Sequence, residues 1–214
     1  MKIKYLAHSS FLITADDGTR IITDPYTPGQ GIKYAPIEET ADIVTVSHDH
    51  GDHNNIAGVK GNPQVVRESG MVKGVTFKAV PTAHDTTGGS ERGTNTVMCM
   101  VVSGVRIVHL GDLGHFLTDN QVTEIHKVHV LLVPVGGFFT IDAATATEVA
   151  EQVRARVIIP MHYKTDKSAD MPIEGVDAFL KAKDNVVKVG GSEIEFTVPT
   201  LPAGPQFTVL EPSL

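Results

Sequence analysis

The chain has 214 residues, of which 41% are hydrophobic and 20% charged, which is the composition of an ordinary globular protein. This length is enough to bury a full two-layer core, so we expect one domain over residues 1–214. A net charge of −7 with dispersed Lys and Arg argues against a groove for long nucleic acid, and no apolar run is long enough to span a bilayer.

Short strands are predicted along the first part of the chain. Alternating or β-branched apolar residues predict strands at 3–6, 11–14, 20–23 and 43–46, with a hairpin turn at Asp16-Asp17-Gly18. His8 lies between the first two strands, and Asp24, which precedes a proline, is interpreted as a turn residue. Residues 28–36 are rich in Gly and Pro and predict a loop.

Directly after the strand at 43–46 the chain carries a dense run of polar side chains, Ser47-His48-Asp49-His50-Gly51-Asp52-His53. This run holds three imidazoles and two carboxylates, which cost desolvation energy unless a cation lies among them. Histidine and aspartate together suit zinc, manganese or iron. We therefore expect a metal site in this loop rather than a His-rich surface turn.

Three further strand ends carry an ionisable side chain. The strand at 75–80 is followed by His84, the strand at 105–110 by Asp112, and the strand at 157–160 by His162. Because strand ends at one edge of a sheet converge in space, we expect these side chains to meet the run at 48–53. Together they offer enough nitrogen and oxygen donors for two metal ions with positions open to water and substrate.

The other elements follow from periodicity and turn signals. Helices are predicted at 118–127, where Thr118 and Gln121 form a capping box, at 142–154 and at 173–181. The remaining strands are predicted at 64–67, 96–102, 128–135, 186–189, 193–198 and 207–210. The glycine-rich segment 86–95 follows His84 directly, so we expect it to border the site and to be mobile.

These motifs resemble the metallo-β-lactamase fold hydrolases. The family's His-x-His-x-Asp-His signature is present in full as His48, His50, Asp52 and His53, and its downstream ligands are similar to His84, Asp112 and His162. Four shorter phrases are similar to small bacterial and archaeal Zn-dependent hydrolases related to the ascorbate-phosphate lactonase branch. They are His8-Ser9-Ser10, Thr23-Asp24-Pro25, Gly111-Asp112-Leu113-Gly114-His115 and Pro160-Met161-His162-Tyr163.

The resemblance implies an α+β fold, namely an αββα four-layer sandwich of two mixed β-sheets flanked by helices, with a dinuclear metal site at one edge. In that arrangement Asp112 bridges two divalent metal ions, and each ion has three further ligands. The ligands are His48, His50 and His84 for the first metal, and Asp52, His53 and His162 for the second. Zn²⁺ is the expected metal, with Mn²⁺ or Fe²⁺ as the alternatives.

Three residues are candidates for catalysis. Asp52 would orient the attacking water and accept its proton, and His8 and His115 are expected to line the pocket. Asp49 fills a variable position of the signature and is interpreted as a turn residue. The expected reaction is hydrolysis of a small ester, lactone or phosphoester-type substrate by a water that the metals activate.

Two other functions are considered. A phosphodiesterase or nuclease would use the same metal ligands, although the acidic balance weighs against long nucleic acids. A non-catalytic metal-binding regulatory protein would have no need of the full ligand set. The expected partner is a small-molecule substrate, with neither long nucleic acid nor membrane, and a homo-oligomer is left open. The lone Cys99 and the lack of a signal-peptide pattern favour a cytoplasmic location.

Overall fold

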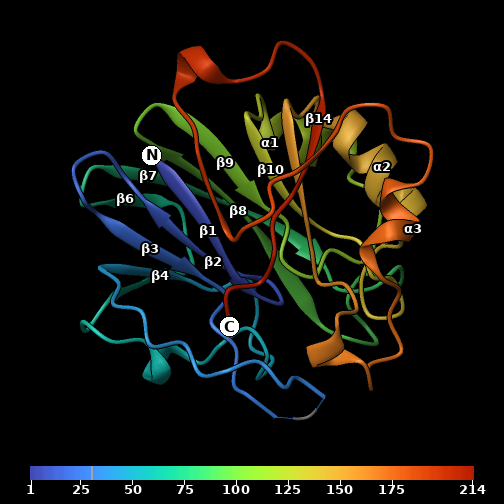
Figure 1. The fold of residues 1–214 in the computed structure, drawn as a ribbon, viewed down its shortest axis with the longest axis horizontal. Coiled ribbons are helices and arrows are strands. Elements are labelled where there is room, and N and C mark those ends of the chain that lie inside the picture. Colours follow the sequence, from blue (N-terminus) through green and yellow to red (C-terminus); the bar gives the residue numbers. More distant parts are fainter. Residues whose placement is uncertain (30) are drawn as a thin grey trace.

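Two mixed β-sheets pack face to face in the computed structural model, which describes residues 1–29 and 31–214 (Figure 1). The first sheet has the strand order β13-β1-β2-β3-β4-β5 and is antiparallel from β13 to β3 and parallel from β3 to β5. Its strands are β1 (Lys2–Ala7), β2 (Ser10–Thr14), β3 (Arg20–Thr23), β4 (Ile43–Thr45), β5 (Gln64–Val66) and β13 (Glu193–Glu195).

The second sheet has the strand order β12-β14-β11-β10-β9-β8-β7-β6. It is parallel from β12 to β9 and antiparallel from β9 to β6. Its strands are β6 (Gly70–Val72), β7 (Val75–Ala83), β8 (Thr94–Val102), β9 (Val105–His109), β10 (Val130–Pro134), β11 (Val157–Met161), β12 (Val186–Lys188) and β14 (Gln206–Val209). Every residue of β10 and of β11 is buried, as expected for parallel strands covered on both faces.

Side chains of the first sheet alternate between two apolar cores. Ile21 and Ile43 belong to the large core shared by the two sheets, whereas their neighbours Ile22 and Val44 belong to a second cluster on the outer face. This alternation follows from the period of two along a strand. It explains why the short strands β3 and β4 are apolar at consecutive positions.

An irregular segment covers the outer face of the first sheet. This covering segment, residues 25–29 and 31–42, contributes five buried residues to the outer cluster: Tyr26, Ile32, Tyr34, Ile37 and Ala41. The 3₁₀ helix η1 (Ile56–Gly58) lies in the loop after β4, and its Ile56 packs against the same cluster. The helical layer expected on this face is therefore reduced to one 3₁₀ turn among the described residues.

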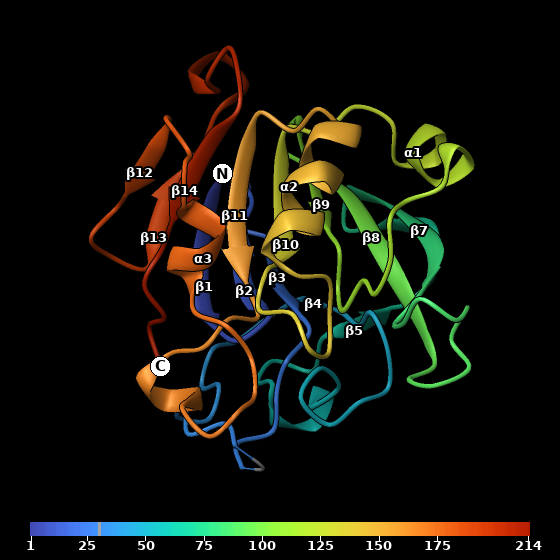
Figure 2. The same cartoon turned by 90° about the vertical axis from the view of Figure 1, so that its right-hand side faces the viewer.

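Helices cover the outer face of the second sheet (Figure 2). α2 (Ala143–Gln152) begins at the N-cap Asp142 and buries Ala146 and Val149, and α3 (Val176–Leu180) lies beside it. α1 (Asp119–Ile125) begins with the predicted capping box of Thr118 and Gln121. The remaining helices are the 3₁₀ turns η2 (Asp166–Ser168) and η3 (Val198–Thr200). Within residues 1–29 and 31–214, no helix is both long and apolar enough to cross a bilayer.

The topology brings the ends of several strands to one edge. β9, β10 and β11 are parallel, and β7 runs in the same direction because two antiparallel pairings separate it from β9. The loop after β4 meets this edge from the first sheet, since the Thr96 N–H in β8 donates to the Ser47 carbonyl at 3.0 Å. The predicted sandwich of two mixed sheets is confirmed, and the ends of its strands carry the polar residues described next.

Candidate metal centre

Three of the predicted metal ligands, His48, His50 and His84, form one group at this edge. One ring nitrogen from each lies within 4.8 Å of the others, and His48 Nε2 is 3.1 Å from His50 Nδ1. His48 and His84 are buried, whereas His50 is exposed. The group joins the loop after β4 in the first sheet to the loop after β7 in the second.

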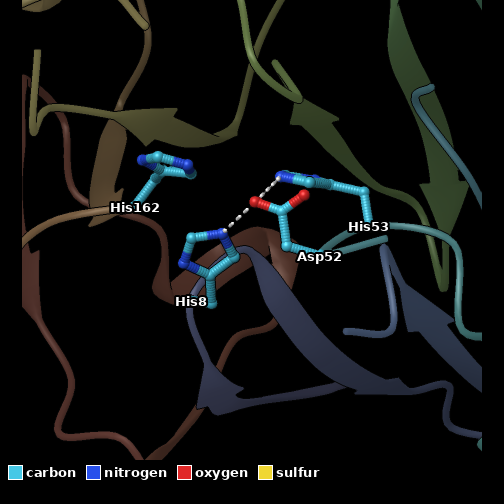
Figure 3. Close-up of side chains that lie close together, drawn as sticks. All are labelled: His8, Asp52, His53 and His162. Carbon is cyan, nitrogen blue, oxygen red and sulfur yellow. Dashed lines mark hydrogen bonds and ion pairs between the residues drawn. The ribbon is translucent and has the colours of Figure 1, made fainter. Parts of the chain in front are cut away.

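The second group contains Asp52, His53 and His162 and also takes in His8, with donor atoms again within 4.8 Å of one another. Figure 3 shows the Asp52 carboxylate directed between His8 and His53, with His162 facing them. Its Oδ2 lies 3.2 Å from His8 Nε2 and 3.7 Å from His53 Nε2. The three imidazoles are buried, and the carboxylate remains partly exposed.

Asp112 lies between the two groups. Its Oδ2 is 3.0 Å from His84 Nε2 and 3.9 Å from His48 Nε2 on one side, and 3.5 Å from His162 Nε2 on the other. Its Oδ1 is 3.3 Å from His53 Nε2. This carboxylate therefore reaches ring nitrogens of both groups, as a bridging ligand must.

Several buried nitrogen and oxygen atoms that could ligate a metal have no hydrogen-bond partner among the described residues. They are Nε2 of His53, both ring nitrogens of His162, Nδ1 of His84 and Oδ1 of Asp112. A buried polar atom without a partner costs free energy, and a cation that accepts its lone pair removes that cost. Imidazole and carboxylate donors at this density thus fit divalent cations of the zinc, manganese and iron type.

The imidazoles of the cluster differ in pKa. Burial lowers the pKa of His48 to about 4 and that of His162 to about 3, which keeps both rings neutral at pH 7. Burial also opposes a charge on His53, but the carboxylates of Asp112, Asp24 and Asp52 together outweigh burial and raise the pKa of His53 well above its ordinary value. Neutral rings offer lone pairs directly, whereas His53 must release a proton first. Metal binding here is therefore in competition with protons.

Behind the cluster, Asp24 and Ser47 orient two of the imidazoles. Asp24 accepts a hydrogen bond from His53 Nδ1 at 2.9 Å and others from the backbone N–H and the hydroxyl of Ser47. The same hydroxyl is 2.9 Å from His48 Nδ1. Because Nδ1 of both rings is engaged, Nε2 of both rings faces Asp112. Asp24, interpreted from the sequence as a turn residue, is thus a buried part of the site.

Three residues of the site have left-handed backbone conformations. The φ angles are 56° at His8, 38° at Asp24 and 50° at His162. Residues other than glycine rarely adopt this region, and surrounding contacts must hold them there. The His8 carbonyl accepts from the Tyr5 hydroxyl at 2.8 Å and from the His162 N–H at 2.9 Å. These bonds join the ends of β1 and β11 and place the His8 and His162 rings 4.2 Å apart.

Glycines allow the strand-end loops to approach one another. A Cβ on Gly114 would lie 2.3 Å from the carbonyl carbon of His84, and one on Gly136 would lie 2.3 Å from the His162 carbonyl oxygen. Asn95 fixes the loop after β9, because its Oδ1 accepts from the Asp112 N–H at 3.0 Å. Because Gly114 and Gly136 have no side chain, the loops can pack closely enough to bring the candidate metal ligands together.

The structure does not bring His115 into the cluster. Its Nε2 accepts from the Ala83 N–H at 3.1 Å, and its Nδ1 donates to the Phe116 carbonyl at 2.6 Å. Since both ring nitrogens are bound to backbone, the ring attaches the loop after β9 to the end of β7. The predicted catalytic role of His115 has no support in this geometry. Asp49 is exposed and pairs with Arg67 at 2.8 Å, in line with its interpretation as a turn residue.

A cleft of about 520 Å³ opens onto His50 and Asp52. Its walls include Ile32 of the covering segment, Arg92 of the loop after β7 and Phe139 of the loop after β10. A larger cavity of about 650 Å³ lies between α2 and β14, but none of the clustered histidines or aspartates lines it. The cleft over His50 and Asp52, as formed by the described residues, therefore gives access to the cluster.

The loop after β7 is held by Asp85. Its carboxylate accepts hydrogen bonds of 2.7 to 2.9 Å from the backbone N–H groups of Thr87, Gly89, Glu91 and Arg92. The segment 86–95 borders the cleft as predicted. The expectation that it is mobile has no support here, because it rested on the glycines and left this carboxylate out of account.

Comparisons with known proteins agree with this geometry. Residues 2–162 match the model of the beta-lactamase superfamily domain. A UPF0173 metal-dependent hydrolase from Carboxydothermus hydrogenoformans is 32% identical over 194 residues, with 77% of this chain and 85% of the relative covered. A similar hydrolase from Archaeoglobus fulgidus is 28% identical over 220 residues, with 88% and 94% covered. The solved structure of a proposed Zn-dependent hydrolase of the metallo-beta-lactamase superfamily from Thermotoga maritima has a TM-score of 0.78 and 38% identity and covers 98% of both chains.

Proposed function

Because this chain belongs to the metallo-β-lactamase superfamily of metal-dependent hydrolases, we propose that it is a two-metal hydrolase of small ester, lactone or phosphoester-type substrates. The observation that carries the two-metal part is the position of Asp112, whose oxygens lie 3.0 Å from His84 Nε2 and 3.3 Å from His53 Nε2. One carboxylate that reaches two separate groups of imidazoles is what a dinuclear site requires.

The two donor groups define where the ions would be held. One ion would take His48, His50 and His84, and the other would take Asp52, His53 and His162, with Asp112 shared. His8 lies in the same group, but its Nε2 is engaged by the Asp52 carboxylate at 3.2 Å. Zn²⁺ suits this donor set best, and Mn²⁺ and Fe²⁺ are the alternatives. When bound, such ions polarise the scissile carbonyl or phosphoryl oxygen and lower the pKa of a water.

Asp52 is the acid of the cluster that reaches the cleft. Its Oδ2 is occupied by His8, and its Oδ1 has no hydrogen bond within the described residues. Oδ1 is thus free to orient an attacking water and to accept its proton. His8 holds the carboxylate in this orientation and is itself fixed through its carbonyl. This assigns proton transfer to Asp52 and a positioning role to His8.

The proposed partners of the enzyme are limited to small molecules. Its partner is a small-molecule substrate that enters the cleft over His50 and Asp52. We propose no long nucleic acid or membrane as a partner, in line with the net charge of −7. The free, buried thiol of Cys99 is compatible with a cytoplasmic location.

Metal analysis and a substrate panel test the proposal together. The purified protein is expected to hold about two divalent ions per chain, to lose hydrolysis of lactone, phosphodiester or thioester substrates on chelation, and to regain it when metal returns. His84→Asn should lower metal content and turnover. His126→Asn is a matched control, because His126 is exposed and its φ of 57° is tolerated by Asn. A protein that binds no divalent metal and cleaves no member of the panel would contradict the proposal.

A further inference from the structure

Arg92 is the single Lys or Arg that lines the cleft within residues 1–29 and 31–214. Its guanidinium makes no hydrogen bond or ion pair with the described residues, in contrast to Arg20 and Arg67, which both pair with carboxylates. A cationic side chain at the wall of a cleft, with no internal partner, is available to an anionic group from outside.

The backbone of Arg92 is held independently of its side chain. Its N–H donates to Asp85 Oδ2 at 2.8 Å, in the same set of bonds that shapes the loop after β7. The guanidinium lies over the Phe139 ring, 5.9 Å from its centroid, and this cation–π contact adds a second restraint. Arg92 is thus presented to the cleft from a fixed point. A change of its side chain would leave the loop in place.

The neighbouring carboxylate of Glu91 forms no ion pair with Arg92 among the described residues. Glu91 also lines the cleft, but its Oε1 faces the Thr87 hydroxyl of its own loop at 3.4 Å. The lining also includes the apolar side chains of Ile32 and Met171. The cleft therefore combines one available cation, apolar lining side chains and a floor of His50 and Asp52.

We infer that Arg92 binds an anionic group of the substrate, a carboxylate or a phosphate, and that Phe139, Ile32 and Met171 contact the apolar part that separates this group from the scissile bond. The inference rests on the proposed function, because it assigns the substrate class of the same cleft. Arginine suits this role since its planar fork can donate two parallel hydrogen bonds to one anion.

Matched esters test the inference through specificity. The metal-loaded enzyme is assayed with 4-carboxyphenyl butyrate and 4-phosphonophenyl butyrate, and with the neutral 4-(methoxycarbonyl)phenyl butyrate. In Arg92→Gln the ratio of anionic to neutral kcat/KM should fall about tenfold, mainly through KM, and Arg92→Lys should recover part of it. Arg154→Gln, an exposed residue outside the cleft, is the matched control and should leave the ratio unchanged. The two anionic esters show whether carboxylate or phosphate is preferred.

A binding measurement separates this inference from the proposed function. Calorimetry with benzoate, phenylphosphonate and the neutral benzyl alcohol is carried out on the parent protein and on Arg92→Gln. The two anions should bind the parent about tenfold more tightly than the variant, whereas benzyl alcohol should not distinguish them. If the protein binds no divalent metal and cleaves neither these esters nor any member of the substrate panel, but this difference is found, the proposed function fails and the anion site stands. If esters are cleaved while both the kcat/KM ratio and anion binding are equal in parent and variant, the role of Arg92 is refuted.

Discussion

Asp24 and His53 share a fully buried hydrogen bond of 2.9 Å in which the ring Nδ1–H donates to a carboxylate oxygen. This bond fixes the tautomer of His53 and leaves Nε2 directed at Asp112, 3.3 Å away. The two residues are far apart in the chain, and Asp24 is buried and does not line the cleft. We therefore expect the candidate metal centre to depend on Asp24, a buried residue that does not line the cleft.

Replacing Asp24 by Asn should weaken metal binding by about 10- to 100-fold. The amide keeps one oxygen and turns the other into a donor, so it cannot accept from both the Ser47 N–H and His53 Nδ1. Competition with a chelator of known affinity measures the change. Asp184→Asn, on the exposed surface, is the matched control. Equal metal affinity in the Asp24 variant and the parent would show that the bond is dispensable.

Replacing Asp112 by Asn should remove the shared ligand. The amide is of similar size, but it has lost the charge, and its NH₂ cannot donate to a cation. Bound metal should fall, chiefly at one position, and hydrolysis should drop by orders of magnitude. Elemental analysis and turnover are measured beside the parent and the Asp184→Asn control. If the variant keeps its full metal content and near-parent turnover, Asp112 is not the bridge.

Replacing Asp85 by Ala should release the loop after β7. Four backbone N–H groups would lose their acceptor, including those of Gly89 and Glu91. Hydrogen exchange of these amides should accelerate by about tenfold or more, while the amides of β8 stay protected. In the parent the loop amides should exchange slowly despite the glycines. Fast exchange in the parent would instead support the mobility expected from the sequence.

The ion pairs of Glu39 should make a pH-dependent contribution to the free energy of unfolding. Glu39 lies 2.7 Å from Lys4 Nζ and 2.8 Å from Arg20, and the hydrogen bond from Lys4 is the main cause that lowers the pKa of Glu39 below its ordinary value of 4.5. A lowered pKa means stabilisation that is complete above the unfolded-state value and is lost as the pH falls through the folded-state value. Since the three side chains remain partly exposed, the contribution is at most about 1 kcal/mol.

Urea unfolding of Glu39→Gln and the parent measures this contribution. The variant should be less stable at pH 7, and the difference should shrink as the pH falls below 4.5. Lys60 and Glu38 form an ion pair in which both side chains are exposed. Glu38→Gln therefore serves as the control and should have little effect on stability at pH 7 or below pH 4.5. A difference that grows towards acid would mean that the sign is wrong.

Long nucleic acids should bind weakly at physiological salt. The chain has 25 acidic and 18 basic residues, and the cleft carries a single arginine. Fluorescence anisotropy with labelled duplex DNA and structured RNA measures the affinity. Sub-micromolar binding with a steep dependence on salt would overturn this prediction.

Most strands could be predicted because their patterns are local. The segment 20–23 coincides with β3, and the segment 75–80 lies within the longer β7. β6 (Gly70–Val72) was not predicted, since this three-residue edge strand exposes Met71 and contains a glycine, and neither alternation nor burial is visible in its sequence. The glycines and prolines of residues 28–36 predict only a loop, because the apolar residues of the covering segment follow no period.

The site was predictable where donors follow strands and was missed where the signal is tertiary. Asp24 follows β3 just as His84 follows β7, so the same strand-end argument applies to it, but the adjacent proline favoured a turn. His115 is close to Asp112 in the sequence, but both of its ring nitrogens are bound to backbone groups, so this geometry gives its predicted role no support. Asp85 belongs to a third case: a carboxylate that shapes a loop through main-chain bonds has no pattern in the sequence.

The covering segment belongs to both the outer core and the cleft, because Ile32 packs in one and lines the other. Met171, which is distant from Ile32 in the sequence, also packs against this cluster and lines the cleft. A mutation that widens the cleft here also removes apolar contacts from the cluster that contains Ile22 and Val44. We therefore expect substitutions at Ile32 or Met171 to change the shape of the cleft and the stability of the fold together. Directed evolution towards bulkier substrates would advance faster from a parent first made more thermostable, or by changes at Phe139, which lies outside that shared core.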